Sequence, residues 1–475
     1  MKLSSIFKEY KGEDVEISGL SINSKTTKDG DLFICIKGIN VDRHDYIDEA
    51  IKNGAVALIC AKDVNVNAPY IKVDNPNNYL RYIYTTFYGN PQDKLSLIGV
   101  TGTDGKTSTT TIIQQLIGDD KCGYIGTNGY ACKNIKGETD NTTPGIESLY
   151  SILAEFNDAG CAYVSMETSS EAFYHHRLDN LTFAIGILTN VDREHLNTHK
   201  TLENYINCKK QLFRQSKIAI LNSNDKYFEE FKDINKNTYT YGYKQSDDLY
   251  IKNYEVYPNK TEIDFLYDNK EYHIVSPLLG KFNIENLAAA ILACLKLDFS
   301  FEQISKNIDS LFIDGRMMSI NLGQDFHVLV DYAHTPNGLK SLFEFTNKLK
   351  VNKKIVVTGN AGQRDASKRK YVGELCVLNN DHVIFTYEDP RFEDPLKIID
   401  DLTELVKDKN NYETVIDRKE AIIKAINMAN KDDLIMILGK GNEDWQIIKG
   451  EFIEFNDCEQ AKKAIKEKLK QSNNN

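Results

Sequence analysis

Long apolar runs are missing from this 475-residue sequence, and the longest ones are far too short to span a bilayer. The first residues also lack the apolar segment of a signal peptide. A basic excess is missing as well, because the net charge is -11 and the pI is about 5.5. Nucleic-acid backbones require a basic face, so we expect no nucleic-acid partner. These absences predict a cytoplasmic protein without membrane insertion.

Cysteine pairs at metal-binding spacing are absent too. The nine cysteines are scattered, and no two form a Cys-x-x-Cys motif. Scattered cysteines in a long chain predict free thiols in a reducing cytosol rather than a disulfide framework or a zinc site. The sequence also shows no internal repeat at the periods of solenoid proteins.

Apolar and helical patterns divide the chain into three α/β regions, which suits a chain too long for one core. We expect domains over residues 1–91, 92–314 and 315–475, with Gly89-Asn90-Pro91 as the first linker. The first should be a small α/β domain and the second a parallel-sheet domain. Residues 245–277 read as a β-meander inserted in the second. Strands and helices alternate after residue 315, which predicts a Rossmann-like third domain.

A glycine-rich segment lies between a predicted buried strand, Leu95–Val100, and a predicted helix, Thr107–Ile117. Strand, turn and helix in this order open a parallel α/β sheet and can hold phosphate on backbone N–H groups. Lys106 would reach the phosphates and Thr107 would ligate Mg²⁺. A turn that binds nothing is disfavoured by Gly-Lys-Thr in this context. The expected ATP-binding residues here are Gly102, Thr103, Asp104, Gly105, Lys106, Thr107 and Ser108.

The segment from Thr101 to Thr107 departs from the strict phosphate-loop pattern and resembles the variant loop of the Mur ligase family. About ten further motifs occur in family order over nearly the whole chain. They are similar to the branch of tripeptide synthetases that adds a third residue to UDP-MurNAc-L-Ala-D-Glu. The resemblance implies an ADP-forming amide ligase of peptidoglycan synthesis, expected to act as a monomer. Its implied substrates are ATP, the UDP-MurNAc-dipeptide and a diamino acid.

The resemblance also implies where the UDP-linked substrate binds. Asn23-Ser24-Lys25 and Asp42-Arg43-His44 look like the signature of the UDP-binding domain, and Asn141-Thr142-Thr143-Pro144 resembles the loop that holds the peptide. The implied substrate-binding residues are Ser24, Thr142, Thr143, Ser169, His175 and Arg177. Two positions depart from the family, since Glu171 stands where His is common and His175 where Gln often occurs.

Two Mg²⁺ ions are implied by the same resemblance. Their ligands would be Thr107, Glu167, His195 and Lys209, with Lys209 carbamylated to N6-carboxylysine. Carbamylation converts a cation into an oxygen-donor anion, which suits a hard metal. Taken alone, Lys209 is an ordinary solvated helix residue. The implied catalytic residues are Lys106, Lys209, His195 and Arg316, and further nucleotide contacts are expected at Asn286, Arg316, Asp331 and His334.

The third substrate would bind in the last domain. The implied contacts are Arg364, Glu388, Asp389, Pro390, Arg391, Gly439 and Glu443. Related enzymes for meso-diaminopimelate typically have Arg at the position of Arg391 and Asn at the position of Asp389. Asp389 therefore adds a negative charge, which would favour an ammonium group. We expect meso-diaminopimelate over L-lysine.

Two alternatives stay open on the sequence. Another Mur-type ligase, for polyglutamate or poly-amino-acid synthesis, would share most motifs, although the UDP-type first domain argues against it. A nucleotide-binding paralogue without ligase activity is suggested by the departures at Asp104, Glu171, His175, Ala361 and Asn442.

Overall fold

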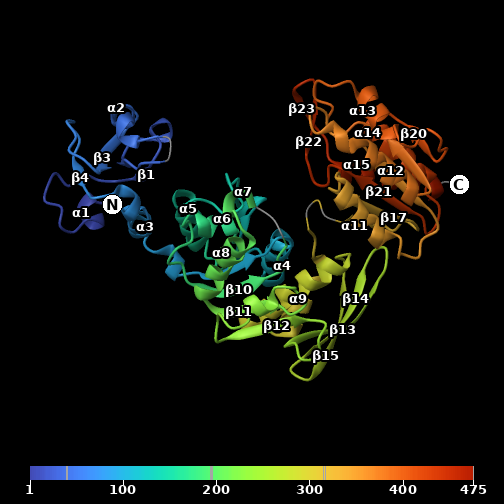
Figure 1. Cartoon of the computed structure of the whole chain (residues 1–475), viewed down its shortest axis with the longest axis horizontal. Coiled ribbons are helices and arrows are strands. Elements are labelled where there is room, and N and C mark those ends of the chain that lie inside the picture. Colours follow the sequence, from blue (N-terminus) through green and yellow to red (C-terminus); the bar gives the residue numbers. More distant parts are fainter. Residues whose placement is uncertain (39–40, 193–195, 314, 316, 474–475) are drawn as a thin grey trace. The chain divides into compact units, whose positions relative to one another are not determined.

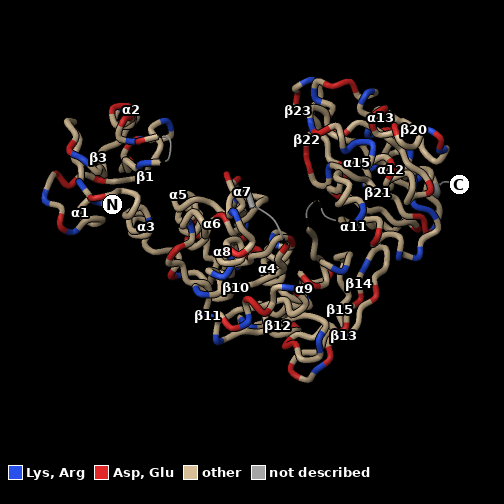
Figure 2. Tube along the Cα trace, viewed as in Figure 1, with Lys and Arg blue, Asp and Glu red and all other residues tan. Residues whose placement is uncertain are grey.

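The computed structural model describes residues 1–38, 41–192, 196–313, 315 and 317–473. The chain divides into two compact units, Met1–Thr240 and Tyr241–Asn475, and both are built from helices and from parallel and antiparallel strands. None of the helices in the described part of the chain combines the length and the hydropathy needed to cross a bilayer. Lys and Arg are distributed among Asp and Glu over both units (Figure 2).

The first unit begins with a small parallel sheet of four strands in chain order. The strands are β1 (Gly19–Ser21), β2 (Asp31–Ile34), β3 (Ala55–Cys60) and β4 (Tyr70–Lys72). The helices are α1 (Leu3–Ile6), α2 (Ile47–Lys52) and α3 (Pro76–Phe87). The Asn75 side chain caps α3 by accepting from Asn77 N, and Pro76 occupies its first turn, where a missing N–H costs nothing.

The larger sheet of the first unit has the order β11-β10-β5-β9-β6-β7-β8. Its strands β10 and β11 are labelled in Figure 1. Its strands are β5 (Ser96–Thr101), β6 (Cys122–Gly126), β7 (Gly129–Cys132), β8 (Ile135–Gly137), β9 (Tyr163–Glu167), β10 (Phe183–Leu188) and β11 (Ser216–Asn222). Its helices are α4 (Lys106–Ile117), α5 (Ile146–Asp158), α6 (Ser170–Tyr174), α7 (Leu196–His199) and α8 (Leu202–Arg214).

Register within this sheet brings three strand ends together. β5 lies between β9 and β10 and is parallel to both, with Thr101 beside Leu188 and Val100 beside Glu167. The carboxyl ends of parallel strands share one edge, where open α/β sheets usually bind ligands. The segments that follow β5, β9 and β10 therefore meet at that edge.

The second unit begins with the predicted β-meander, which is confirmed. β12 (Thr238–Gly242), which crosses the boundary, pairs with β13 (Leu249–Val256), and β13 runs antiparallel to β14 (Thr261–Tyr267) and β14 to β15 (Lys270–Ser276). The helices α9 (Lys281–Lys296) and α10 (Phe301–Ser305) follow.

A second α/β sheet follows, with the order β16-β17-β21-β18-β19-β20. Its strands are β16 (Met318–Ser319), β17 (His327–Asp331), β18 (Lys354–Thr358), β19 (His382–Phe385), β20 (Tyr412–Thr414) and β21 (Leu434–Leu438), and the hairpin β22 (Trp445–Ile448) with β23 (Glu451–Glu454) stands apart. Only β16 is antiparallel to its neighbour among the described strands of this sheet. The helices are α11 (Pro336–Thr346), α12 (Arg369–Asn379), α13 (Pro395–Thr403), α14 (Arg418–Met428) and α15 (Asp457–Asn473).

Strand β21 shows how this sheet is covered on both faces. Leu434, Met436 and Leu438 pack in the cluster with α11, α12 and α13, whereas Ile435 and Ile437 pack with α14 and α15. Successive side chains of a strand point to opposite faces, so a strand buried on both faces is apolar throughout. This explains the unbroken apolar run, and the predicted α/β architecture of the third region is confirmed.

One expectation about cysteine is wrong. Cys132 on β7 and Cys161, just before β9, are joined by a disulfide, whereas the sequence predicted free thiols throughout. The two residues are 29 positions apart, so their proximity is a product of the sheet that no local spacing reveals.

Candidate active site

The phosphate loop runs from the end of β5 to the start of α4, as predicted. Gly105 caps α4 with a φ of 79°, a conformation that favours glycine. Gly102 has no room for a side chain, because a Cβ there would lie 1.8 Å from Thr189 Oγ1. The residues after β10 also hold the loop, since Asp104 N donates to Asn190 Oδ1 (2.9 Å) and Asp104 O accepts from Thr189 Oγ1 (2.6 Å). The neighbouring strand thus fixes the shape of the loop.

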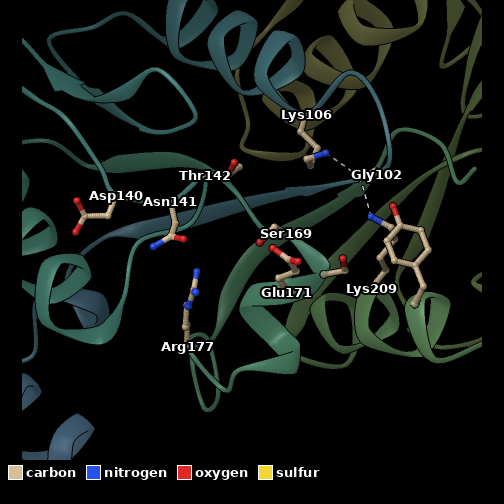
Figure 3. A pocket seen from close by; sticks show the side chains of 11 residues that line it. Gly102, Lys106, Asp140, Asn141, Thr142, Ser169, Glu171, Arg177 and Lys209 are labelled. Carbon is tan, nitrogen blue, oxygen red and sulfur yellow. Dashed lines mark hydrogen bonds between the residues drawn. The ribbon is translucent and has the colours of Figure 1, made fainter. Parts of the chain in front are cut away.

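Two lysines converge on one carbonyl of this loop. Lys106 Nζ donates to Gly102 O at 3.0 Å and to Thr103 O at 2.7 Å, and Lys209 Nζ donates to Gly102 O at 2.7 Å (Figure 3). Lys209 is 1% exposed, and its Nζ lies 4.4 Å from the centre of the Tyr205 ring. Two ammonium groups this close repel each other, and a buried charge is costly. An anion placed here, or loss of one positive charge, would reduce both the repulsion and the cost of burial.

Glu167 ends β9 and is 1% exposed. Its Oε1 accepts from Thr107 Oγ1 (2.9 Å), Tyr124 OH (3.1 Å) and Thr127 N (2.9 Å). The carboxylate is therefore held beside the hydroxyl that follows Lys106 in the loop. Carboxylate and hydroxyl oxygens next to a phosphate loop are the donors that Mg²⁺ uses to bridge protein and phosphate. The structure brings together these two predicted ligands.

A pocket of about 330 Å³ opens beside the two lysines (Figure 3). It is lined by Gly102, Lys106, Asp140, Asn141, Thr142, Ser169, Ser170, Glu171, Arg177, Tyr205 and Lys209. Three predicted substrate residues, Thr142, Ser169 and Arg177, thus share one cavity with both lysines. Thr143 is buried instead, where its Oγ1 donates to Glu167 O (2.8 Å) and its carbonyl accepts from Arg177 Nη1 (3.0 Å).

Two other predicted substrate residues lie outside this pocket. His175 is exposed at the end of α6 and does not line the cavity. Ser24 is buried, and its hydroxyl donates to Glu49 Oε2 at 2.6 Å. The predicted metal ligand His195 and the predicted catalytic Arg316 lie outside the described residues.

Sequence reasoning missed several residues that shape the site. Tyr205 precedes Lys209 by one helical turn on α8, and its hydroxyl lies 2.9 Å from Thr103 Oγ1. The spacing of four residues could have revealed it, because such pairs share a helix face. Glu171, which the sequence marked only as a departure from the family, lines the pocket and accepts from Thr198 Oγ1 at 2.9 Å. Asn190 opens the family motif that ends in His195, but its contact with the loop and that of Thr189 follow from the order of the strands in the sheet.

Asp104 is exposed, and the loop is shaped by its backbone rather than its carboxylate. We therefore expect Asp104→Asn to lower the KM for ATP about two- to fivefold, the scale of one exposed charge near phosphates. Steady-state kinetics with varied ATP measure this, with the exposed Asp158→Asn as control. An inactive Asp104→Asn protein would show that the carboxylate itself is required.

In the second unit, the predicted nucleotide-binding residues make polar contacts with residues close to them in the sequence. Asp331 ends β17, with Oδ2 accepting from Met317 N and Oδ1 from Ala333 N, both at 2.7 Å. Asn286 is buried near the start of α9 and donates to Asn283 Oδ1 at 3.3 Å. His334 Nδ1 lies 2.9 Å from Tyr332 O.

The predicted amino-acid residues of the second unit are brought together from three segments. Pro390 O lies where a Cβ on Gly362 would be, so the 359–362 turn packs on the segment after β19. Glu388 Oε2 lies where a side chain on Gly439 would be, at 2.5 Å from an added Cβ. Asp389 and Glu443 both contact Lys440. Arg364 is exposed in this unit.

Glu388 is 6% exposed, and its Oε2 is among the buried atoms that lack a hydrogen-bond partner in the described structure. Burial raises the pKa of Glu388 to about 7. Between about pH 4.5, its ordinary pKa, and pH 7 the folded chain therefore keeps a proton that the unfolded chain releases. The free energy of unfolding should fall as the pH rises through that window.

We expect Glu388→Gln to remove this loss, on the order of 3 kcal/mol above pH 7. Scanning calorimetry from pH 5 to pH 8 would show the variant gaining stability over the parent as the pH rises. The exposed Glu454→Gln is the matched control. Equal pH profiles for the parent and Glu388→Gln would contradict the prediction.

Together these features define an α/β protein with a phosphate loop, a buried carboxylate and two converging lysines. Three family models match the chain: "Mur ligase family, catalytic domain" over residues 16–89, "Mur ligase middle domain" over 100–294 and "Mur ligase, glutamate ligase domain" over 315–441. The chain belongs to the Mur ligase family.

Within the family, the chain is similar to ligases that are named for diaminopimelate. The chain is 36% identical to UDP-N-acetylmuramoyl-L-alanyl-D-glutamate–2,6-diaminopimelate ligase 1 of Clostridium acetobutylicum, over 98% of this chain and 100% of the relative. It is 35% identical to the ligase of that name in Bacillus licheniformis, over 96% of each chain. A solved structure of such a ligase superposes with a TM-score of 0.77 at 27% identity, covering 99% of both chains.

Proposed function

We propose that this chain is an ATP-dependent ligase that joins diaminopimelate to UDP-MurNAc-L-Ala-D-Glu, an ADP-forming step of peptidoglycan and cell-wall synthesis. The observation that carries the proposal is the shared pocket, where Lys106 and Lys209 face Ser169, Thr142 and Arg177. Full-length similarity to ligases named for this reaction supports it.

We distribute the binding of the substrates over three domains, 1–91, 92–314 and 315–475. Residues 1–91, with Ser24, would hold the uridine nucleotide. Residues 92–314 would hold ATP on the phosphate loop and the peptide in the pocket. Residues 315–475 would hold the amino acid. We further propose that the enzyme acts as a cytosolic monomer.

The donors present fit Mg²⁺. Glu167 and Thr107 offer hard oxygen ligands, and Glu167 is anchored by Tyr124 and Thr127 so that it need not reorganise. We propose two ions, with His195 and a carbamylated Lys209 completing the set. When bound, the ions would neutralise charge on the phosphates. Carbamylation fits the burial of Lys209, and a carbamylated Nζ keeps one N–H for the Gly102 carbonyl.

The chemistry follows from bringing two anions together. The D-Glu side-chain carboxylate would attack the γ-phosphorus of ATP, giving an acyl phosphate and ADP. The amine of the amino acid would then attack the acyl carbon, and the tetrahedral intermediate would expel phosphate and form the amide. Lys106 would stabilise charge on the transferring group, and Arg177 would orient the substrate carboxylate.

Purified protein given UDP-MurNAc-dipeptide, ATP and a panel of amino acids tests the proposal. We expect phosphate release that needs both the dipeptide and meso-diaminopimelate, with less turnover of L-lysine. Strong turnover with lysine and none with diaminopimelate would overturn the assigned amino acid. No turnover with any member of the panel would indicate a nucleotide-binding paralogue.

A further inference from the structure

An ion cluster lies inside the second unit, at the segment after β21. Lys440 is 0% exposed, and its Nζ lies 2.9 Å from Asp389 Oδ1 and 2.7 Å from Glu443 Oε2. Asp389 Oδ1 also accepts from Ile447 N at 3.1 Å. One buried ammonium therefore serves two carboxylates. Asp389 is buried and would face the cost of an unpaired buried charge without Lys440, whereas the side chain of Glu443 is 38% exposed.

This arrangement changes the expected effect of Asp389 on the substrate. On the sequence alone, Asp389 adds a negative charge that would attract an ammonium group from the substrate. In the structure that charge already has a partner, because Lys440 contacts Asp389 directly. An ion pair carries no net charge, so Asp389 with Lys440 presents the same net charge as a neutral asparagine.

Glu443 and Arg391 add one charge of each sign to the residues near the pair, besides Glu388, whose pKa burial raises to about 7. Glu443 shares Lys440 with Asp389, so the three groups together keep one negative charge. Arg391 lies two residues beyond Asp389, and its backbone N donates to Ile447 O at 2.9 Å. Its Nε is buried without a hydrogen-bond partner in the described structure. A group with both an ammonium and a carboxylate matches this balance, whereas a lone ammonium leaves Arg391 unmatched.

We infer that Lys440 is a positioning residue for specificity: by neutralising Asp389, it makes the site select a side chain that ends in a zwitterion over one that ends in an ammonium alone. The inference rests on the proposed function. It assigns to a buried lysine the choice between diaminopimelate and lysine. Without Lys440, two unpaired carboxylates would recruit the cation of the substrate instead.

The test is a double-mutant cycle in the full-length enzyme. Lys440→Met keeps the length of the side chain and removes its charge, and Asp389→Asn removes the charge that Lys440 balances. We expect Lys440→Met to lower the ratio of kcat/KM for meso-diaminopimelate to that for L-lysine at least about tenfold, mainly through the KM of the amino acid. The double variant should regain the parental ratio to within about threefold, since it returns these three positions to the single negative charge of the parent, carried by Glu443.

Lys462 is the matched control. It also pairs with a glutamate three residues away, at 2.8 Å from Glu459, but it lies on the surface. Lys462→Met should leave both kcat/KM values unchanged. If Lys440→Met fails to fold, Lys440→Gln takes its place, because it removes the charge while keeping a group that can donate to Asp389, and the same loss of selectivity is expected.

The outcomes distinguish failure of the proposed function from failure of the inference about Lys440. A parent enzyme that turns over no amino acid would overturn the proposed function. A parent that prefers diaminopimelate while Lys440→Met keeps the same ratio would overturn the inference and leave the function standing. Equal loss of selectivity in the single and double variants would also overturn the inference, since Lys440 would then act independently of Asp389.

Discussion

Lys106→Ala is expected to lower phosphate release by about a hundred- to a thousandfold, the loss seen when one preorganised donor to a reacting group is removed. Among the described residues, Lys106 Nζ donates to the carbonyls of Gly102 and Thr103 and forms no ion pair with an acidic side chain. An anionic phosphate would be the natural partner of this ammonium. Phosphate release measured with the dipeptide and diaminopimelate gives the effect.

Two further variants test whether the loss of activity is specific to the charge of Lys106. Lys106→Arg keeps the charge but changes its shape, so it should retain more activity than the alanine variant. Lys121→Ala removes an exposed lysine of the same unit and should behave as the parent. Because Lys106 also braces its own loop, thermal unfolding of each variant is compared with the parent. Undiminished turnover in a folded Lys106→Ala protein would mean that the loop is not catalytic.

Lys209→Arg is expected to lower activity about a hundredfold, even though arginine keeps a positive charge. A guanidinium does not take up carbon dioxide, so the variant would lose the oxygen donors that a carbamate would supply. If the cation alone mattered, the arginine variant would retain activity. Isotopically labelled bicarbonate followed by NMR should show a carbamate signal in the parent and none in the variant.

The adjacent lysine supplies the control. Lys210 Nζ pairs with Glu230 Oε2 at 2.7 Å on the surface, whereas Lys209 points to Gly102. Lys210→Arg should therefore keep both the activity and the carbamate signal. A carbamate signal that disappears with Lys210 instead of Lys209 would contradict the assignment.

Local patterns in the sequence determined the parts of the fold that depend on local chemistry. The apolar run before Gly102 predicted β5, and the phosphate loop, α4 and the meander at 245–277 follow the expected ranges closely. Apolar periodicity and glycine positions act within a few residues, so one sequence suffices to read them. Family motifs then pointed to Glu167, Lys209 and Arg177, which no local pattern would have selected.

Only the tertiary structure decided which of these residues meet and with what partners. Register beside β5 places Glu167 against Thr107, and the strand end at Thr189 closes the space around Gly102. The disulfide between Cys132 and Cys161 and the ion pair between Asp389 and Lys440 join residues 29 and 51 positions apart. Such contacts depend on how strands and loops pack, because charge balance is set by distance in space. The sequence therefore showed an extra negative charge at Asp389, and the fold showed that it is already neutralised.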